Sequence, residues 1–148
     1  MRLTFERVQP VDGATSLLDW QRIHNAIIPT APLSAGDVVE RAGRNHLEVA
    51  YLDGVAVGCS TVRPPTPDST TATVIARILP EHRRRGLGDR LYQRALATAR
   101  TLGAEAIETV VLASNADGLR FAVRHGFVEF DRYVLPGDTI AFVDLRLT

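Results

Sequence analysis

The architecture of this chain follows from one segment, Arg77-Ile78-Leu79-Pro80-Glu81-His82-Arg83-Arg84-Arg85-Gly86-Leu87-Gly88-Asp89-Arg90-Leu91. An apolar run that begins at Val74 is closed by Pro80, which predicts the end of a strand. From Leu87 to Leu102 apolar residues recur at the spacing of a helix. The segment therefore predicts a strand, an arginine- and glycine-rich loop, and the start of a helix.

This loop has the chemistry of an anion site. The first turn of a helix leaves backbone N–H groups without intrahelical partners, and these groups bind anions. Gly86 and Gly88 carry no side chains that would keep a phosphate away from the N–H groups, and Arg83, Arg84 and Arg85 add positive charge. We expect a phosphate-bearing ligand here.

The whole-chain composition narrows the class of protein. The chain has 148 residues, of which 45% are hydrophobic, so we expect a single domain over residues 1–148. Its single cysteine, Cys59, excludes an internal disulfide and a cysteine-rich zinc site, and we expect no bound metal. No long apolar run follows Met1, so we expect a cytoplasmic protein without a membrane segment.

Charge is balanced overall but concentrated locally. Seventeen basic residues stand against seventeen acidic ones, which disfavours a nucleic-acid-binding function for the whole chain. Residues 77–100 nevertheless hold seven arginines against two acidic residues, Glu81 and Asp89, an excess of five positive charges. This distribution favours a local anion site over a nucleic-acid-binding surface.

Strands and helices alternate before the loop. The sequence predicts a strand over 3–8, a helix over 14–28 that stops at Pro29, and a helix over 34–42 that closes at Gly43. Ser34 and Asp37 have the spacing of a capping box. The runs 47–52 and 55–62 flank Asp53-Gly54 and predict an antiparallel hairpin, and a strand over 70–79 follows.

After the loop the pattern gives a parallel crossover. A helix is expected over 88–102 with Gly103 as its C-cap, then a strand over 104–112. A short helix capped by Ser114 or Asn115 and two further strands complete the chain. The predicted fold class is α/β (α+β), with a mixed, mostly antiparallel twisted sheet around one central parallel strand pair.

Two blocks of sequence resemble one family. Arg83-Arg84-Arg85-Gly86-Leu87-Gly88 fits the pattern R/Q-x-x-G-x-G/A of the acyl-coenzyme A loop of the GCN5-related N-acetyltransferase (GNAT) family. The helix that begins at Asn115-Ala116 and ends in Gly126-Phe127 resembles a second motif of that family. Two blocks in the right order are far more specific than one glycine-rich hexapeptide.

The resemblance implies how a cofactor is bound. In this family the central parallel strands splay, helices lie on both faces of the sheet, and the pantetheine arm of acetyl-coenzyme A (acetyl-CoA) lies between the splayed strands. By this similarity the backbone of Ile78 and Leu79 contacts the arm, the loop holds the pyrophosphate, and Arg83 or Arg84 pairs with a phosphate. The implied cofactor-binding residues are Ile78, Leu79, Arg83, Arg84, Arg85, Gly86, Leu87, Gly88, Asp89 and Asn115.

The implied reaction is transfer of an acetyl group to a primary amine of a small molecule or peptide, with a backbone N–H near Ile78 at the developing oxyanion. The family often uses a tyrosine as general acid, but that position is Ala122 here, and residues 70–79 contain no Asp or Glu. The catalytic residues therefore remain unassigned. His125 and Tyr133 are alternative proton donors, although structural roles are favoured for both.

Several alternatives stay open at this point. Ala122 and the absent carboxylate favour, as a second hypothesis, a non-catalytic acyl-CoA-binding or regulatory module of the same fold. Asn115 caps a helix, contacts the cofactor, or does both. Trp20, His24 and Asn25 lie on the first helix, which borders the acceptor site in this family. Exposed sheet edges also allow two copies of the chain to pair as a homodimer.

Overall fold

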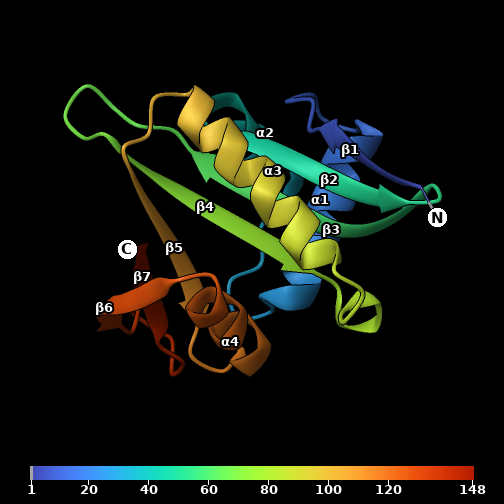
Figure 1. The fold of residues 1–148 in the computed structure, drawn as a ribbon. Helices are drawn as coiled ribbons and strands as arrows, with labels where there is room; N and C mark the ends of the chain where they lie inside the picture. Colours follow the sequence, from blue (N-terminus) through green and yellow to red (C-terminus); the bar gives the residue numbers. More distant parts are fainter. Residues whose placement is uncertain (1) are drawn as a thin grey trace.

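The protein was analysed as a computed structural model, which describes residues 2–148. One seven-stranded sheet, in the order β1-β2-β3-β4-β5-β7-β6, extends through these residues (Figure 1). The elements in chain order are β1 Leu3–Arg7, α1 Thr15–Ile27, α2 Ala35–Arg44, β2 His46–Leu52, β3 Val55–Arg63, β4 Thr71–Ile78, a 3-10 turn Pro80–His82, α3 Leu87–Thr101, β5 Ala106–Leu112, α4 Ala116–Arg124, β6 Phe127–Tyr133 and β7 Phe142–Leu147.

The predicted central parallel pair is confirmed, and it is short. β4 and β5 are paired only from Thr71–Thr73 to Ala106–Glu108, and every other neighbouring pair of strands is antiparallel. Beyond this point β4 continues to Ile78 paired only with β3, β5 continues to Leu112 paired only with β7, and the two strands diverge (Figure 1). The mostly antiparallel sheet therefore opens at its centre.

Local sequence chemistry explains the elements around this opening. Asp53 and Gly54 have φ values of 51° and 84°, as the predicted hairpin turn between β2 and β3 requires. The predicted capping box is present, because Ser34 Oγ accepts from the Asp37 N–H at 3.1 Å and Asp37 Oδ2 accepts from the Ser34 N–H at 2.9 Å. Both motifs are short-range and do not depend on the rest of the fold.

The end of the second helix differs from the prediction. Gly43 was expected to close this helix, but α2 continues through Gly43 to Arg44 and ends at Asn45. Val38 and Ala42, which α2 buries against the core, hold the helix in place. Tertiary packing of this face therefore outweighs the roughly 1 kcal/mol by which a glycine disfavours a helix interior.

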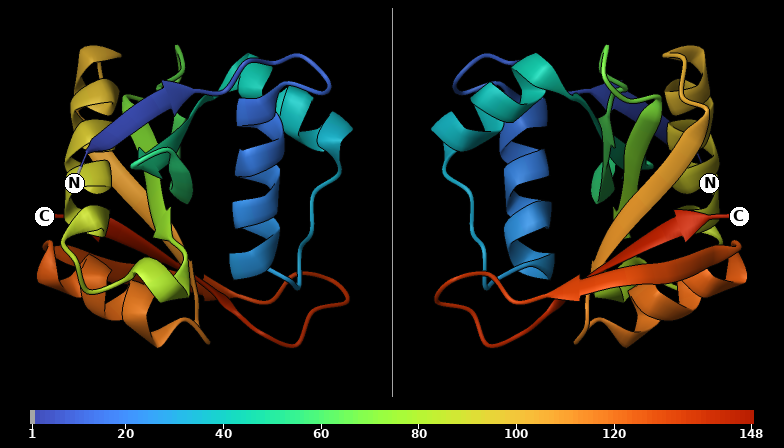
Figure 2. Two further views of the ribbon diagram at one scale, coloured as in Figure 1. Left: turned by 90° about the vertical axis from the view of Figure 1, so that its right-hand side faces the viewer. Right: turned by 90° about the vertical axis from the view of Figure 1, so that its left-hand side faces the viewer.

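Helices cover the two faces of the sheet in pairs. α1 and α2 lie on one face, and α3 and α4 lie on the other (Figure 2). The α1/α2 face is packed with buried side chains that include Leu17, Trp20, Val38, Val49 and Cys59. Two further clusters pack α3 and α4 on the opposite face. Helices on both faces were expected, and this arrangement leaves the open end of the β4–β5 pair accessible.

Within residues 2–148, no helix combines the length and the apolar character needed to cross a membrane.

Candidate functional site

A cavity of about 920 Å³ occupies the opening between β4 and β5. Its lining includes side chains that point to opposite faces of the sheet. Thr109 and Val111 lie on the α4 side of β5, whereas Val110 and Leu112 lie on the α1 side. Ile27 and Ile28, at the end of α1, also line it. The cavity therefore reaches both faces of the sheet through the gap between its central strands.

One wall of this cavity is the free edge of β4. The Leu79 N–H donates to Val57 O on β3 at 2.9 Å, so alternate residues of β4 point their backbone groups toward β3. The backbone N–H and C=O groups of Ala76 and the N–H of Ile78 therefore point the other way, into the gap where β5 has diverged. The Ile78 carbonyl on this edge accepts from Arg83 Nε at 2.9 Å. This edge can accept an extended ligand as an added strand.

The arginine- and glycine-rich loop lies at the mouth of the cavity. Within the described residues, the backbone N–H groups from Arg84 to Asp89 donate to no backbone or side-chain acceptor, and Gly86, the N-cap of α3, provides no side-chain cap. The positive end of the α3 dipole lies at the same place. The predicted anion cradle is thus present as a run of unpaired donors.

The backbone conformation of the loop gathers these donors. Gly86 has a φ of 76°, in the left-handed region, and Arg84, which is not a glycine, has a φ of 67°. Left-handed residues between extended or helical ones turn successive N–H groups toward one side, which forms a concave anion site. A positive φ at a residue other than glycine is strained, and such residues cluster at functional sites.

Arginine side chains surround the cradle and share one carboxylate, that of Asp117 on α4. Arg83 donates from Nη1 to Asp117 Oδ2 at 3.4 Å and from Nε to Ile78 O at 2.9 Å. Arg84 Nη2 lies 3.7 Å from Asp117 Oδ1, and Arg120 also donates to Asp117. These positive charges lower the pKa of the Asp117 carboxyl despite its partial desolvation. Three guanidinium groups are thereby held at the cavity mouth.

Asn115 connects the cavity to the start of α4. Its Oδ1 accepts from the Gly118 N–H at 3.0 Å, so the predicted capping role is confirmed, and the side chain also lines the cavity. A β-carbon on Gly118 would lie 2.6 Å from Asn115 Nδ2 and 2.9 Å from Val111 Cγ1. Only glycine at position 118 therefore allows Asn115 its present orientation.

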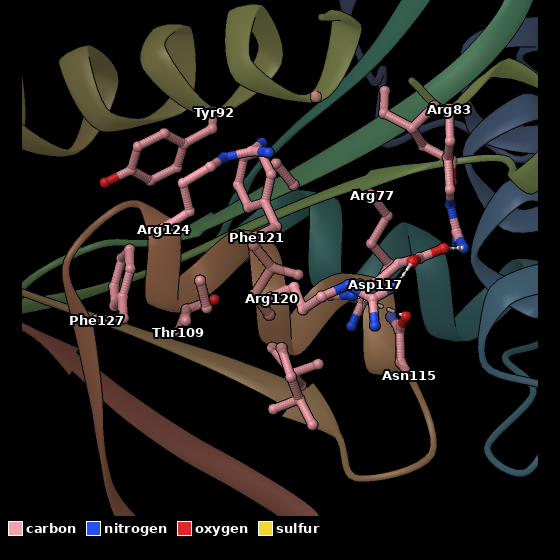
Figure 3. A pocket seen from close by; sticks show the side chains of 18 of the residues that line it. Arg77, Arg83, Tyr92, Thr109, Asn115, Asp117, Arg120, Phe121, Arg124 and Phe127 are labelled. Atoms are coloured by element: carbon pink, nitrogen blue, oxygen red, sulfur yellow. Dashed lines mark hydrogen bonds and ion pairs between the residues drawn. The ribbon is translucent and has the colours of Figure 1, made fainter. Parts of the chain in front are cut away.

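Aromatic rings form the wall away from the loop. Tyr92 on α3 contacts Phe121, His125 and Phe127, with ring centroids 5.8, 4.8 and 6.0 Å apart. Figure 3 shows Tyr92 and Phe127 on one side of the cavity, and Arg83, Asp117 and Asn115 on the other. Burial raises the pKa of the Tyr92 hydroxyl. The cavity thus has a cationic end and an aromatic end.

The structure brings together most of the residues that the sequence predicts for the site. Those that line the cavity are Ile78, Arg83, Arg84, Gly86, Gly88, Asp89 and Asn115. Arg85 is exposed and does not line the cavity, and Leu87 is packed in the core, so Leu87 offers only a backbone N–H. Leu79 does not line the cavity, because its N–H donates to Val57 and its carbonyl accepts from His82. The free β4 edge instead presents Ala76, which the sequence alone did not single out.

Three further polar residues of the site lie on α4: Asp117, Arg120 and Arg124. No spacing in the sequence distinguishes them from ordinary solvent-facing helix residues. Arg124 lies over the Phe121 ring at 5.4 Å, and this contact also holds its charge beside the cavity. These residues contribute charge to the site only because α4 packs across the opening from the loop.

The candidate proton donors are distributed unevenly. Ala122 lines the cavity and is 3% exposed, so no hydroxyl lies where the family often has a tyrosine. His125 does not line the cavity; its Nε2 lies 3.1 Å from Asp89 Oδ1 without hydrogen-bond geometry. Tyr133 donates to Asp144 at 3.2 Å and is also outside the lining. Tyr92 and Thr109 are the lining residues that carry a hydroxyl group.

No group of three or more His, Cys, Asp or Glu side chains within residues 2–148 is arranged to hold a metal ion. The donors gathered at the cavity are N–H groups and guanidinium groups, which suit an anion.

The opened parallel strand pair with an anion cradle at its mouth is the arrangement that the resemblance to acyl-CoA-dependent acyltransferases implies. The sequence model of the acetyltransferase (GNAT) family matches residues 15–127. The chain therefore belongs to the GNAT family, whose cofactor is acetyl-CoA. A comparison with the sequences of curated proteins finds no match.

Solved structures share the whole fold. A candidate phosphinothricin N-acetyltransferase is 24% identical, with a TM-score of 0.78 over 99% of this chain and 98% of that chain. The ribosomal-protein-S18-alanine N-acetyltransferase from Escherichia coli is 18% identical, with a TM-score of 0.77 over 99% and 93%. YncA, a candidate acetyltransferase from Salmonella typhimurium with its cofactor acetyl-CoA, is 18% identical, with a TM-score of 0.74 over 100% and 94%. At these identities the likeness establishes the fold.

Proposed function

We propose that this protein is an N-acetyltransferase that transfers the acetyl group of acetyl-CoA to a primary amine of a small molecule or peptide. The observation that carries this proposal is the run of unpaired backbone N–H groups from Arg84 to Asp89 at the mouth of the central cavity. An uncompensated run of donors at a helix N-terminus is suited to a pyrophosphate.

The rest of the cavity fits the same ligand. The unpaired N–H and C=O of Ala76 and the N–H of Ile78 suit an extended pantetheine arm, which carries amide groups. Arg83, fixed by its hydrogen bond to Ile78 O, is placed to pair with a phosphate beside the cradle. A side chain at Gly88 would project toward Phe121 and Ile78, at 3.5 and 3.6 Å, into the space between loop and cavity.

Acetyl-CoA supplies an activated acetyl group as a thioester. In the proposed reaction a neutral amine forms a C–N bond with the acetyl carbon while the C–S bond breaks. One proton leaves the amine nitrogen and one reaches the thiolate sulfur. The backbone N–H of Ile78, directed into the gap, is the proposed donor to the oxygen on which negative charge develops.

The named acceptors of the similar structures differ. One is named for phosphinothricin and another for an alanine of a ribosomal protein, so the shared fold does not select between a small molecule and a polypeptide. The acceptor must be inferred from the residues of this chain.

Titration of the protein with acetyl-CoA in a calorimeter tests the cofactor assignment. We expect binding that is lost by at least about 100-fold in Gly86→Asp, because a carboxylate would enter the cradle and a side chain would be strained at a φ of 76°. Gly54→Asp is the matched control: its φ of 84° imposes the same backbone strain in the β2–β3 turn, away from the cavity. Equal loss in both variants, or no binding at millimolar acetyl-CoA, contradicts the proposal.

Ala122 favours a second function, a non-catalytic acyl-CoA-binding or regulatory module, because its buried methyl group replaces the usual acid. Release of free thiol during a broad screen of amines separates the two functions. Turnover with any amine supports the transferase, whereas cofactor binding without turnover across the screen supports the module.

A further inference from the structure

Three arginines on the α1/α2 face are not used by the proposed cofactor site: Arg41 on α2, Arg63 on β3 and Arg77 on β4. We refer to them as the α1-side arginines. Arg77 is opposite Cys59 and Arg63 is opposite Thr73 in the antiparallel β3–β4 ladder. Because Thr73 and Arg77 are four residues apart on one strand, Arg63 and Arg77 project from the same face of the sheet.

That face is the one covered by α1 and α2. Cys59, the ladder partner of Arg77, is completely buried in the cluster that packs these helices. The neighbours of Arg77 on β4, Ala76 and Ile78, pack instead on the α3 side. Arg41 lies on α2 next to Ala42, which packs in the same cluster, so it is on this side of the sheet. Burial lowers the pKa values of Arg63 and Arg77, and the charge of Arg41 lowers them further.

Within residues 2–148, none of the α1-side arginines has a side-chain hydrogen bond or a carboxylate within 4.0 Å, in contrast to Arg83, Arg94 and Arg146. Arg77 is half-buried, and its burial, followed by the charges of Arg63 and Arg41, lowers its pKa. A desolvated cation without a partner reduces the stability of the fold. Such an arrangement indicates an anion that comes from outside the chain.

The titratable groups near the α1-side arginines do not neutralise their positive charge. Glu108, on the same face of the sheet, is already paired with Arg146. Asp144 acts on Arg63 but accepts a hydrogen bond from Tyr133 at 3.2 Å. His24 stays neutral, because burial and the charges of Arg77 and Arg41 lower its pKa to about 4. The three cations therefore face one carboxylate that is not in an ion pair.

Arg77 lines the central cavity, together with Ile27 and Ile28 of α1. The phosphate cradle lies at the start of α3, the helix that covers the opposite face of the sheet from α1 and α2 (Figure 2). The cavity thus has two cationic regions that reach it from opposite faces. A cofactor whose phosphates bind at the cradle leaves Arg77 facing the side from which an acceptor enters.

From this juxtaposition we propose that the acceptor is a primary amine that carries an anionic group, either a carboxylate or a phosphorus oxyanion, and that Arg77 binds this group with support from Arg41 and Arg63. This inference rests on the proposed acetyltransferase function. Arginine is suited to the role because its planar guanidinium can donate two parallel hydrogen bonds to either anion. Arg77 would then determine specificity without touching the reacting atoms.

Matched acceptors test the inference. Each amino acid would be compared with its carboxamide, and aminoalkyl phosphonates with the corresponding alkyl amines, at saturating acetyl-CoA with thiol release as the readout. We expect kcat/KM for the best anionic acceptor to exceed that of its neutral partner at least about tenfold. Comparison of carboxylates with phosphonates identifies which anion the arginines prefer.

Arg77→Met supplies the decisive variant, because methionine keeps an apolar stem and removes only the charge and the donors. KM for the anionic acceptor should rise at least about tenfold, while turnover of the neutral partner and affinity for acetyl-CoA stay unchanged. Arg100→Gln, an exposed arginine of α3 outside the cavity, is the charge-matched control and should change neither value. The melting temperature of Arg77→Met should be unchanged or higher, since an unpaired cation is removed.

The outcomes are distinguishable. Equal kcat/KM for acids and amides overturns the inference and leaves the acetyltransferase function standing. Loss of acetyl-CoA affinity in Arg77→Met also overturns it, because the arginine would then belong to the cofactor site. Acetyl-CoA binding without turnover of any amine contradicts the proposed function itself.

Discussion

Glu48 on β2 accepts two hydrogen bonds from Arg94 on α3, at 2.6 Å from Nε and 3.2 Å from Nη2. The Glu48 side chain is 6% exposed and also contacts His46 Nε2 at 3.0 Å, whereas Arg94 remains 46% exposed and lies over the Phe5 ring. This pair fastens α3, the helix that begins at the cofactor loop, to the sheet.

Glu48→Gln should lower the free energy of unfolding by about 2 kcal/mol, because Arg94 and His46 lose a charged acceptor in a largely buried place. Urea unfolding at pH 7 measures the change. Glu40→Gln is a suitable control, since Glu40 forms an exposed pair with Arg44 and its removal should cost less than about 0.5 kcal/mol. Equal effects would show that the buried pair does not stabilise the fold.

The Glu48–Arg94 pair also predicts that the stability of the fold falls at acidic pH. Burial acts to raise the pKa of Glu48, but the hydrogen bonds from Arg94 and His46 bring it below its ordinary value of 4.5. Its stabilising contribution is therefore complete above pH 4.5 and is lost as the pH falls through the lower folded-state pKa. Wild type should lose this contribution on acidification below pH 4.5, and Glu48→Gln should have none to lose.

The environment of His24 leads to a second prediction, a change of stability with pH in a higher pH range. Asn25 is fixed by the backbone of Leu33, to which its Nδ2 donates at 3.0 Å and from which its Oδ1 accepts at 2.9 Å. Asn25 Oδ1 therefore also accepts from His24 Nδ1, at 3.0 Å, so the proton of the neutral ring is on Nδ1. Burial lowers the pKa of His24 from 6.5 to about 4.

The unfolded chain takes up this proton at a higher pH than the folded one. The free energy of unfolding is therefore highest above pH 6.5, where His24 is neutral in both states, and it falls progressively toward pH 4. The total change is about 3 kcal/mol. Denaturant unfolding at closely spaced pH values from 7.5 to 4 should show this slope in wild type, and His24→Asn should flatten it. A slope that survives in the variant must come from another group.

The features of the fold and the site that could be predicted from the sequence are those set by short local motifs. The Asp53-Gly54 turn, the Ser34–Asp37 box and the arginine- and glycine-rich loop were predicted correctly, because each depends on residues a few positions apart. The parallel crossover also followed, since the strand, loop, helix and strand occur consecutively.

Features set by contacts between distant residues did not follow. β7 is inserted between β5 and β6, and no local pattern specifies that order. The side on which Arg77 lies depends on the β3–β4 register, which the sequence leaves undetermined. Asp117 and Arg120 acquire their roles only because α4 packs across from the loop. The cofactor loop is thus a local property, whereas the acceptor side is a product of the assembled sheet.

Gly118→Ala should disturb both α4 and the cavity. The new β-carbon would lie 2.6 Å from Asn115 Nδ2, so Asn115 must turn away and lose its cap to the Gly118 N–H. We expect the free energy of unfolding to fall by about 1 to 2 kcal/mol and acetyl-CoA affinity to fall as Asn115 leaves the cavity wall. Thermal melting and calorimetry measure the two effects.

The control for this change is Gly43→Ala in α2. Nothing lies within 4 Å of a β-carbon there, so the substitution should stabilise the protein by about 1 kcal/mol through helix propensity alone. Stabilisation by Gly118→Ala as well would show that Asn115 has room to adapt.

Asp117 is expected to weaken cofactor binding in the wild-type protein. Its carboxylate contacts Arg83, Arg84 and Arg120, the guanidinium groups that a phosphate at the cradle would also use. Asp117→Asn keeps the shape of the side chain but removes a negative charge beside the ligand. Arg83 stays oriented in this variant, since its Nε donates to Ile78 O. Acetyl-CoA should therefore bind about threefold to tenfold more tightly.

The effect of ionic strength distinguishes this electrostatic cause from a change in shape. The difference in affinity between Asp117→Asn and wild type should shrink as salt is raised from 0.05 to about 0.5 M, because the contacts lie at an exposed cavity mouth where ions screen them. Asp138→Asn, in the β6–β7 connection, removes the same charge elsewhere and should leave acetyl-CoA affinity unchanged. Weaker binding by Asp117→Asn would instead mean that the carboxylate is needed to align the arginines, and that Ile78 O alone does not hold Arg83 in place.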